Sequence, residues 1–587
     1  MLSRRLPALR CGLLIFALAL CATTSASDGD ARGEYLERRA RLAAELNTPV
    51  VLFGYEDVSF GLADPERKSP ESTFRQEENF YYLTGHREEG AALLLVPPTA
   101  EAKAAGLPVE TLYLSPRDKR RESWDGARIG PDDPGIGERT GFARVKPMSE
   151  LKGDLERAAK VFPKMNTLAP RQEEGAARTH AGHWLGWLKQ ALPKTEFENA
   201  RAALGRMRQV KSPQEQELLR VAIERSMDAH REAMKAMRPG MHEYEIASLM
   251  AYTFERAGCE RPGYPPIVGS GPNSTVLHYA EPRRRMEAGE VVVIDVAGEC
   301  AGYTADITRT LPTNGKFSAR QREIYEIVLG AQNAAIAAVK PGMTMAREGK
   351  NSLYKVAYEY INTHGKDSKG EPLGKYFIHG LGHHIGLQVH DAGDPNRPLE
   401  PGMILTIEPG IYIPEENLGV RIEDIVLVTQ TGAVLLTASL PRTPEAIEQA
   451  MQAPASGRNA LCVTDFTPPA YPPLAQRARI EGEIEVLAEI DQSGQVVRTM
   501  ARTVTETLRG ETNRGAGSLL HKAAEESVKK WVFACIDEDA VFPIRHTVLL
   551  DFKVRAAAAA SPSPVVGFEA PSRVEVVVRP APIVNSE

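Results

Sequence analysis

The sequence predicts a multidomain protein that combines an α/β domain with two domains of the α+β class. Strand and helix patterns alternate over about the first 200 residues, which is typical of an α/β domain. A Pro-Gly-Met motif then recurs about 100 residues apart, as in a two-fold repeated unit. A charged, proline-containing linker at residues 446–460 separates a third, smaller unit from the rest.

The composition is that of a globular protein large enough for several cores. The chain has 587 residues, of which 42% are hydrophobic and 25% are charged. That length suggests about three or four domains. The net charge of −6 at pH 7 gives no electrostatic basis for binding nucleic acid, so no nucleic-acid partner is expected.

Residues 1–26 have the pattern of a secretory signal peptide. Arginines at positions 4, 5 and 10 precede an apolar run at residues 11–20, and small residues follow at 24–26. The apolar run is too short to span a bilayer, although an uncleaved anchor is the alternative. We expect cleavage after Ala26 and export of the mature protein. Lipid attachment at Cys21 is not expected, because the bulky Leu20 precedes it.

Residues 27–205 are predicted to form the N-terminal α/β domain. Strands are expected at 50–54, 91–96 and 112–114, and helices at 34–46, 150–162 and 180–192. The helices are inferred from apolar residues that recur at helical spacing. In the last of them, Trp184 and Trp187 lie three residues apart and therefore on one face.

The second predicted unit, residues 206–445, begins with a strong helix signal. Ser212 and Glu215 form a capping box at the start of a long helix. The Pro-Gly-Met motif that follows this helix at 239–241 recurs after a second long helix at 341–343. We expect a two-fold pseudo-repeat with a site between its halves. The alternative is that the motif is only a common helix stop.

Four acidic residues lie in segments that otherwise have the pattern of buried strands. They are Asp295 and Asp306 on predicted strands 290–296 and 303–310, and Glu408 and Glu423 on predicted strands 403–408 and 419–428. Burying an unpaired carboxylate is very unfavourable, and neighbouring carboxylates repel one another. Two divalent cations would balance the four negative charges. The pattern therefore predicts a site with two metal ions, which can orient a substrate and polarise its carbonyl.

Between the two acidic pairs lies a histidine-rich stretch, HGLGHHIGLQVHD at residues 379–391. Its glycines allow a ligand to approach closely. Histidine is the commonest metal ligand and the usual acid or base near neutral pH. A donor set rich in oxygen, with one imidazole, suits manganese, cobalt or iron, or zinc with expanded coordination.

In order and context, five of these residues resemble the metal ligands of the pita-bread metallopeptidases. They are Asp295, Asp306, His383, Glu408 and Glu423. The resemblance covers residues 209–442 and implies a pita-bread catalytic domain of the α+β class. Upstream, the motifs FRQ at 74–76 and FYYLTG at 80–85 resemble the N-terminal domain of aminopeptidase P, which implies a creatinase-like α/β fold there. Metal-free creatinase is not expected, because all five ligands are present.

The resemblance implies two divalent metal ions, with manganese preferred, and a role for each ligand. Asp306 and Glu423 would bridge the two ions. Asp295 would bind one ion with both oxygens, while His383 and Glu408 would complete the other. A hydroxide between the ions would attack the scissile carbonyl, and Glu408 would also act as the general base.

Four further residues match positions around the substrate in the same family. The resemblance implies that His390 stabilises the oxyanion of the tetrahedral intermediate. His278 would contact the substrate, and His379 would line the pocket after the cleaved bond. Arg421 lies two residues before Glu423, where a strand would place it on the same face, and would hold the carboxylates in place.

The resemblance implies an Xaa-Pro aminopeptidase, which releases the first residue of peptides that have proline in second position. The alternative within the family is a prolidase, which cleaves only Xaa-Pro dipeptides. The motif IVGSG at 267–271 and the two N-terminal motifs favour the aminopeptidase. An envelope binding protein on a peptidase scaffold is a third hypothesis, against which the five intact ligands argue. The expected partners are peptide substrates and further copies of the chain in a homo-oligomer.

Residues 461–555 are predicted to form a small α+β domain. Strands are expected at 481–491 and 546–554, and an amphipathic helix at 519–532. The segments TPPAYPPLA at 467–475, GEIEV at 482–486 and KWVF at 530–533 resemble the C-terminal domain of the TonB energy transducer. This resemblance implies a partner in the cell envelope and supports a periplasmic location. Residues 556–587, which begin with alanines, serines and prolines, are predicted to be a disordered tail.

Four cysteines remain once the predicted signal peptide is removed, and their spacing matches no zinc template. Cys462 and Cys535 fall in the C-terminal unit and could form a bridge in an oxidising compartment. Cys259 and Cys300 are either bridged or buried thiols, and the sequence leaves this choice open.

Overall fold

The computed structural model divides the chain into two compact units, Met1–Gln452 and Ala453–Glu587. It describes residues 28–55, 74–170, 179–452, 462–465, 480–491, 493, 495–508, 511–512, 519–534, 544–554, 565–568 and 573–578. The predicted signal peptide lies outside these residues. Across the described ranges, no helix has the length and apolar character needed to cross a membrane.

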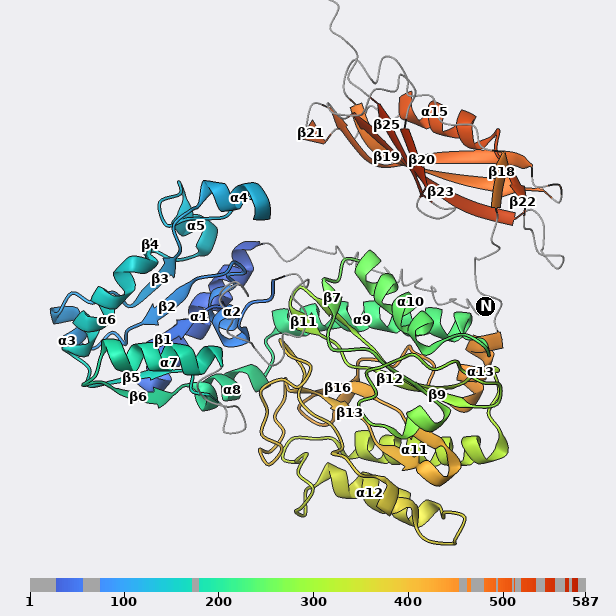
Figure 1. Ribbon diagram of the computed structural model, residues 1–587, viewed down its shortest axis with the longest axis horizontal. Helices are drawn as coiled ribbons and strands as arrows, with labels where there is room; N and C mark the ends of the chain where they lie inside the picture. Colours follow the sequence, from blue (N-terminus) through green and yellow to red (C-terminus); the bar gives the residue numbers. More distant parts are fainter. Residues whose placement is uncertain are drawn as a thin grey trace, which may run out of the picture. The chain divides into compact units, whose positions relative to one another are not determined.

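The N-terminal part of the first unit is a six-stranded sheet with helices on both faces (Figure 1). From edge to edge, the strands are β4 (Val145–Pro147), β3 (Glu110–Leu114), β2 (Ala92–Leu95), β1 (Val50–Phe53), β5 (Lys164–Thr167) and β6 (Glu196–Asn199). The helices are α1 (Asp28–Leu46), α2 (Glu78–Thr84), α3 (Ala100–Ala104), α4 (Lys119–Asp125), α5 (Ile136–Thr140), α6 (Leu151–Ala159), α7 (His180–Ala191) and α8 (Arg201–Gln209). β1 pairs antiparallel with β2 and parallel with β5.

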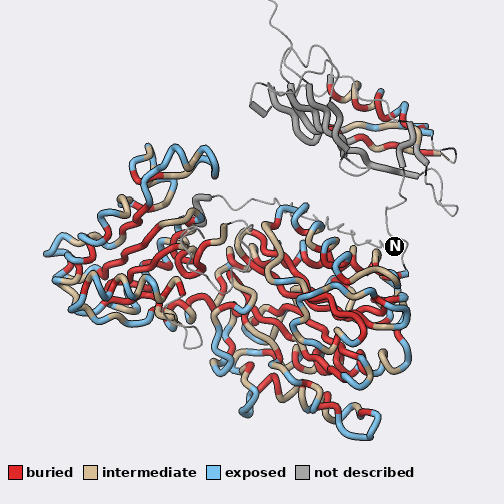
Figure 2. The backbone as a smooth tube through the Cα atoms, in the orientation of Figure 1, coloured by how far each residue is buried: buried red, intermediate tan, exposed pale blue. Residues whose placement is uncertain are grey.

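The central strand β1 is buried on both faces (Figure 2). Val50 and Leu52 pack into one core, whereas Phe53 packs into the other. Such a strand must be apolar throughout, which explains its sequence VVLF. Trp184 and Trp187 of α7 both contact Phe53, with the Trp184 ring stacked at 3.9 Å. The prediction that the two tryptophans share a helix face is confirmed.

The remainder of the first unit contains the same arrangement twice, two helices and a three-stranded antiparallel sheet. The first half has α9 (Pro213–Ala236), α10 (Glu243–Arg256), β8 (Ile267–Ser270), β9 (Val291–Asp295) and β12 (Thr308–Pro312). The second half has α11 (Ala319–Ala338), α12 (Leu353–His364), β13 (Ile404–Ile407), β16 (Asp424–Val428) and β17 (Ala433–Leu435). Figure 1 shows the first half in green and the second in yellow-green to orange.

The Pro-Gly-Met motif ends the first helix of each half in the same way. Gly240 and Gly342 have φ angles of 92° and 88°, in the left-handed region that glycine adopts without strain. The carbonyl of Met241 accepts a hydrogen bond from the Met286 N–H, shortly before β9, and that of Met343 from the Leu399 N–H, shortly before β13. The predicted pseudo-repeat is therefore present, and the capping box at Ser212 is also formed.

Two predicted strands are interrupted, and each interruption falls at an acidic residue. Asp306 lies between β11 (Tyr303–Thr304) and β12, and Glu423 lies between β15 (Leu418–Arg421) and β16. At each break the chain changes partner. β11 pairs with β10 (Gly298–Cys300) and β12 with β9, while β15 pairs with β14 (Gly410–Ile413) and β16 with β13. The prediction of continuous strands was wrong, because a change of partner leaves no mark in a locally strand-forming sequence.

The second unit has a mixed six-stranded sheet, a helix, and a two-stranded sheet of β18 (Cys462–Asp465) and β22 (Val532–Ala534). The larger sheet has the order β21 (Glu511–Thr512), β20 (Val496–Leu508), β19 (Ile480–Ile490), β23 (Ile544–Val554), β25 (Arg573–Val578) and β24 (Val565–Phe568). The helix α15 (Leu519–Val528) precedes Trp531, whose side chain is fully buried. The two strands and the helix expected here are present, so the α+β class holds for the described part of this unit.

Two expectations near this unit were wrong. The first residues of the predicted linker belong to α13 (Pro444–Gln452), in which Ile447 and Met451 are buried one helical turn apart. The predicted disordered tail contains β24 and β25, and β25 runs parallel to β23. The prediction followed the alanine, serine and proline residues at the start of the tail, whereas the valine-rich segments beyond them favour strands.

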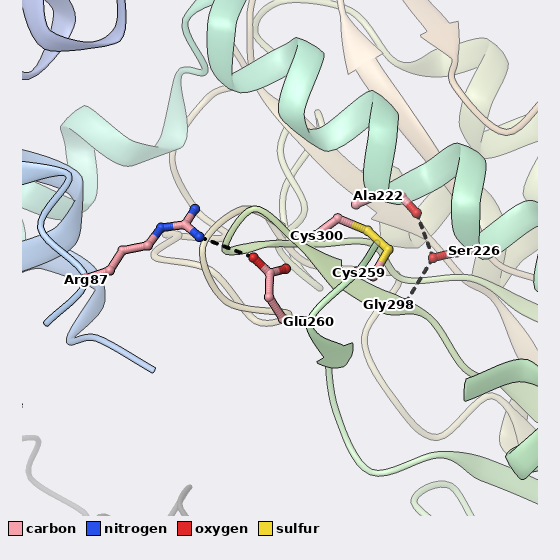
Figure 3. Close-up of a disulfide and its surroundings, with 7 residues drawn as sticks. All are labelled: Arg87, Ala222, Ser226, Cys259, Glu260, Gly298 and Cys300. Carbon is pink, nitrogen blue, oxygen red and sulfur yellow. Dashed lines mark hydrogen bonds and ion pairs between the residues drawn. A yellow bond between two sulfur atoms is a disulfide. The ribbon is translucent and has the colours of Figure 1, made fainter. Parts of the chain in front are cut away.

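Cys259 and Cys300 form a disulfide that joins the segment after α10 to β10 (Figure 3). This settles the choice that the sequence left open for these two residues. Beside the disulfide, the Ser226 hydroxyl of α9 accepts a hydrogen bond from the Gly298 N–H at 3.0 Å. The other predicted bridge cannot be placed, because Cys535 lies outside the described residues.

Candidate metal centre

All nine residues predicted for the site line one cavity of about 250 Å³. They are Asp295, Asp306, His383, Glu408, Glu423, His278, His379, His390 and Arg421. One potential ligand atom from each of Asp306, His383 and Glu423 lies within 4.8 Å of the others. His383 Nε2 lies 3.3 Å from Asp306 Oδ2 and 3.4 Å from Glu408 Oε1. The strand ends and strand breaks that carry the four acids therefore meet at one place.

The carboxyl groups of this cavity are buried beside one another. Burial, with the charges of Asp295 and Glu408, raises the pKa of Asp306 well above its ordinary value. Burial and the charge of Asp306 raise the pKa of Glu423 in the same way. Asp306 Oδ1 and Glu423 Oε1 are buried without a hydrogen-bond partner among the described residues. A cation between them would offset both effects, so these residues fit a metal centre.

Side-chain hydrogen bonds from Tyr264, Arg421 and Thr308 orient two of the acids. Tyr264 donates a hydrogen bond to Asp295 Oδ1 at 2.6 Å, and Arg421 donates to Asp295 Oδ2 at 2.7 Å. Thr308 donates to Glu423 Oε2 at 2.8 Å. Arg421 was predicted to share a strand face with Glu423. Instead, β15 ends at Arg421, and the ion-pair partner of Arg421 is Asp295. Tyr264 and Thr308 were missed, because a single hydroxyl in a strand or loop carries no pattern.

His383 presents its Nε2 atom to the acids. Its Nδ1 lies 3.2 Å from the carbonyl oxygen of His384, and a carbonyl only accepts, so Nδ1 carries the proton. Nε2 is then free to bind a metal ion. The His383 N–H donates to Thr406 Oγ1 at 3.1 Å, and that hydroxyl donates to Glu408 Oε1 at 3.3 Å. Thr406 thus connects two predicted ligands.

Three more histidines face the rest of the cavity. The Tyr412 hydroxyl lies 2.9 Å from His379 Nε2 and accepts from Arg421 Nη1 at 3.0 Å. Burial lowers the pKa of His379 to about 3 and that of His390 to about 4. The His390 ring lies 4.2 Å from the ring of His383. His278, the remaining predicted histidine, is exposed at the cavity.

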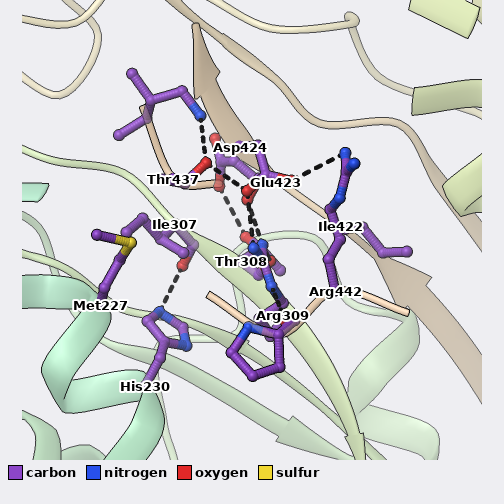
Figure 4. Close-up of polar contacts among 12 residues, drawn as sticks. Met227, His230, Ile307, Thr308, Arg309, Ile422, Glu423, Asp424, Thr437 and Arg442 are labelled. Carbon is purple, nitrogen blue, oxygen red and sulfur yellow. Dashed lines mark hydrogen bonds and ion pairs between the residues drawn. The ribbon is translucent and has the colours of Figure 1, made fainter. Parts of the chain in front are cut away.

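A buried ion pair joins the two halves beside Glu423 (Figure 4). Arg309 Nη2 lies 2.7 Å from Asp424 Oδ1, and both side chains are fully buried. Arg309 Nη1 also donates to the carbonyl oxygens of Glu423 at 2.7 Å and Thr308 at 2.9 Å. Strand β12 of the first half is therefore fixed to the strand break of the second half.

The N-terminal domain contacts the loop that carries His390. Arg75, from the FRQ motif, donates to the carbonyl oxygen of Leu387 and to Glu299 at 2.8 Å. It also pairs with Glu78. The sequence marked this motif only through a family resemblance, and the structure gives it a physical role. One arginine ties the N-terminal domain to both halves of the catalytic domain.

Asp391, which follows His390 in the same loop, is held by two positively charged side chains. Arg208 and Lys211 both bind its carboxylate, Lys211 at 2.9 Å. Burial alone would raise the pKa of Asp391, but the two cations lower it to about 2. A second cavity of about 710 Å³ adjoins this cluster and shares His390 with the metal cavity.

The fold and the site together define a metal-dependent hydrolase. Residues 217–430 match "Metallopeptidase family M24", and residues 35–165 match "Aminopeptidase P, N-terminal domain". The chain is 35% identical to "Xaa-Pro aminopeptidase" of Haemophilus influenzae, covering 71% of this chain and 97% of that protein. Its relative of the same name from Escherichia coli is 34% identical over 72% of this chain and 98% of that protein.

Solved structures agree with these sequence relatives. A structure titled "putative aminopeptidase P from Bacillus anthracis" matches with a TM-score of 0.64 and 28% identity, covering 72% of this chain and 98% of that one. Aminopeptidase P of Escherichia coli with the inhibitor Pro-Leu matches with a TM-score of 0.61 and 32% identity, covering 72% and 99%. The chain belongs to the metallopeptidase family M24, in its aminopeptidase P branch.

Proposed function

We propose that the chain is an Xaa-Pro aminopeptidase, which releases the first residue of a peptide whose second residue is proline. The observation that carries the proposal is the convergence of nine predicted residues on one cavity, five of them of metal-ligand type. The two relatives named Xaa-Pro aminopeptidase match nearly their whole length to this chain and support it.

The four carboxylates would share two cations. Two divalent metal ions, when bound, would polarise the scissile carbonyl and lower the pKa of a water molecule. Asp306 and Glu423 suit the bridging positions, since each keeps one buried oxygen without a hydrogen-bond partner in the described part of the chain. Four carboxylates and one imidazole form a donor set that suits manganese, which we propose as the metal.

Glu408 and the histidines would then handle the proton and the substrate. Glu408 would accept the proton of the attacking water and pass it to the leaving proline nitrogen. Burial raises the pKa of its carboxyl group, which helps it to hold that proton. His390 is neutral near pH 7 and would donate to the developing oxyanion, with His278 beside the substrate. His379, held by Tyr412, would form the wall of the proline pocket.

A dipeptidase is the second candidate, and one relative favours it. "Xaa-Pro dipeptidase" of Pyrococcus furiosus is 40% identical over 246 residues, which is 41% of this chain and 67% of that protein. The cavity of about 710 Å³ that shares His390 with the metal site leaves room for a peptide longer than a dipeptide. This space, together with the match at residues 35–165, supports the aminopeptidase.

We also propose that the chain is exported to the periplasm after cleavage of residues 1–26. The disulfide between Cys259 and Cys300 supports this address, because disulfides persist in oxidising compartments. The C-terminal unit, whose sequence resembles the TonB C-terminal domain, would bind a partner in the cell envelope. We propose a homo-oligomer for the assembled enzyme.

Hydrolysis of two substrates by the manganese-loaded mature chain tests the proposal. We expect cleavage of Arg-Pro-Pro with little cleavage of the dipeptide Ala-Pro. The reverse preference would establish the dipeptidase. Cleavage of neither substrate, with metal shown to be bound, would contradict an enzymatic role and favour an envelope binding protein.

A further inference from the structure

Each half of the catalytic domain inserts one helix side chain between its two ligand-bearing strands. In the first half this residue is His230 of α9, which is fully buried. Its Nε2 lies 3.1 Å from the carbonyl oxygen of Val296. It lies 3.0 Å from that of Ile307 (Figure 4). Because both partners only accept, Nε2 carries the proton and a single hydrogen serves two carbonyls.

In the second half the corresponding residue is Gln332 of α11, which is also fully buried. Its Nε2 donates to the carbonyl oxygen of Ile407 at 2.9 Å and to that of Ile422 at 3.0 Å. The amide has two hydrogens, one for each acceptor. Arg442 donates to its Oε1 at 3.2 Å, so the orientation of the amide is fixed.

The four carbonyls share one property: each belongs to a residue adjacent in sequence to a predicted metal ligand. The neighbours are Val296 to Asp295, Ile307 to Asp306, Ile407 to Glu408, and Ile422 to Glu423. These are also the points at which a strand ends or is broken. A donor placed there fixes the distance between the two main chains just where the regular ladder between the strands stops.

We propose that His230 and Gln332 are positioning residues of the metal centre. Each sets the spacing of one pair of carboxylate ligands through hydrogen bonds to the main-chain carbonyls next to them. The proposal rests on the metal centre proposed above. The two residues act through the main chain rather than by contact with metal or substrate. A misplaced ligand pair would bind its cations less tightly, as is usual when groups that orient ligands are removed.

The difference between the two donors supplies a rescue experiment. Since Gln332 does with two hydrogens what His230 does with one, H230Q should preserve the function of the first half. H230L removes the donor in the first half, and Q332M removes it in the second with little change in volume. S226A is the matched control. Ser226 lies one turn before His230 on α9 and is fully buried. Its hydroxyl accepts a hydrogen bond from Gly298, which is not adjacent in sequence to a predicted metal ligand.

The test is titration of the full, metal-stripped chain with Co²⁺, followed by calorimetry and by visible absorption. We expect H230L and Q332M to weaken Co²⁺ binding about 10–100-fold and to alter the absorption spectrum. H230Q and S226A should keep the wild-type affinity and spectrum. If H230L does not fold, Q332M still decides the question, since it removes the donor in the second half.

Wild-type affinity and spectrum in both H230L and Q332M would overturn the inference, because the side chains would then be ordinary core hydrogen bonds. An equal loss in S226A would overturn it as well. A wild-type chain that binds no Co²⁺ would instead overturn the metal centre itself, so failure of the inference and failure of the proposed function give different results.

Discussion

The two halves of the catalytic domain share a topology but differ in chemistry. The first half offers two aspartates and the positioning residue His230, whereas the second offers two glutamates and the positioning residue Gln332. Each half also orients a carboxylate of the other, since Arg421 bonds to Asp295 and Thr308 bonds to Glu423. The pseudo-repeat has thus duplicated the scaffold, while the site depends on contacts that cross between the copies.

The largest expected effect is the loss of proton transfer, which only the second half provides. E408Q should lower kcat by about 10²–10⁴-fold, because only the second half supplies the general base. D295N should also lose activity, but through metal binding, so excess Mn²⁺ should restore part of its rate. The measurement is kcat on Arg-Pro-Pro across a range of Mn²⁺ concentrations. E415Q, which changes an exposed acid a few residues further along, is the control. Recovery of E408Q at high Mn²⁺ would contradict its role as base.

The contact between the halves can be broken at the buried ion pair. R309M leaves the Asp424 carboxylate buried without its main cation, which should cost about 3–5 kcal/mol of local stability. Hydrogen exchange of the β12 and β16 amides in the metal-free chain measures this. R322M, which breaks partly exposed pairs with Glu445 and Glu448, should change stability by about 1 kcal/mol or less. Equal effects in both variants would show that the Arg309 pair does not join the halves.

The loop that carries His390 belongs to the second half and is held by Arg208 and Lys211, which precede the first half. D391N removes the charge that Arg208 and Lys211 bind, so His390 should lose its position. Since small displacements of a catalytic group can reduce rates by about 100-fold, we expect kcat/KM to fall about 10–100-fold with metal content unchanged. E359Q, at an exposed acid of α12 that lines neither cavity, should match the wild type. Loss of metal in D391N would indicate a different role.

A smaller effect, the pH dependence of stability, distinguishes the positioning residues His230 and Gln332. Burial lowers the pKa of His230 to about 3, whereas an unfolded histidine titrates near 6.5 and Gln332 does not titrate. Between those values the unfolded chain binds the extra proton, so acid favours unfolding. Relative to H230Q, the wild type should lose about 1.4 kcal/mol of stability per pH unit below 6.5. Calorimetric unfolding of both metal-free chains from pH 7 to 5 measures this. A constant difference would contradict a buried, neutral His230.

Local chemistry was readable in the sequence. Acidic residues in otherwise apolar strands and a dense group of histidines indicated seven of the nine cavity residues, because each is a polar group in surroundings that do not require one. The other two, His278 and Arg421, came from the family resemblance. Capping residues such as Ser212 and the helical spacing of Trp184 and Trp187 were equally local.

What the sequence did not predict depends on partners far along the chain. The strand breaks at Asp306 and Glu423 arise from a change of sheet, which adjacent residues do not encode. Tyr264 reaches Asp295 from an irregular segment. His230 did leave a signal, a polar residue on the buried face of a helix, but its partners lie 66 and 77 residues away.

The most direct test of the account is the number of metal ions that the wild-type chain binds while active. We predict two Mn²⁺ per chain by native mass spectrometry, with cleavage of Arg-Pro-Pro that EDTA abolishes and Mn²⁺ restores. Full cleavage by a chain that binds one ion or none would contradict the claim that the two halves build one dinuclear centre.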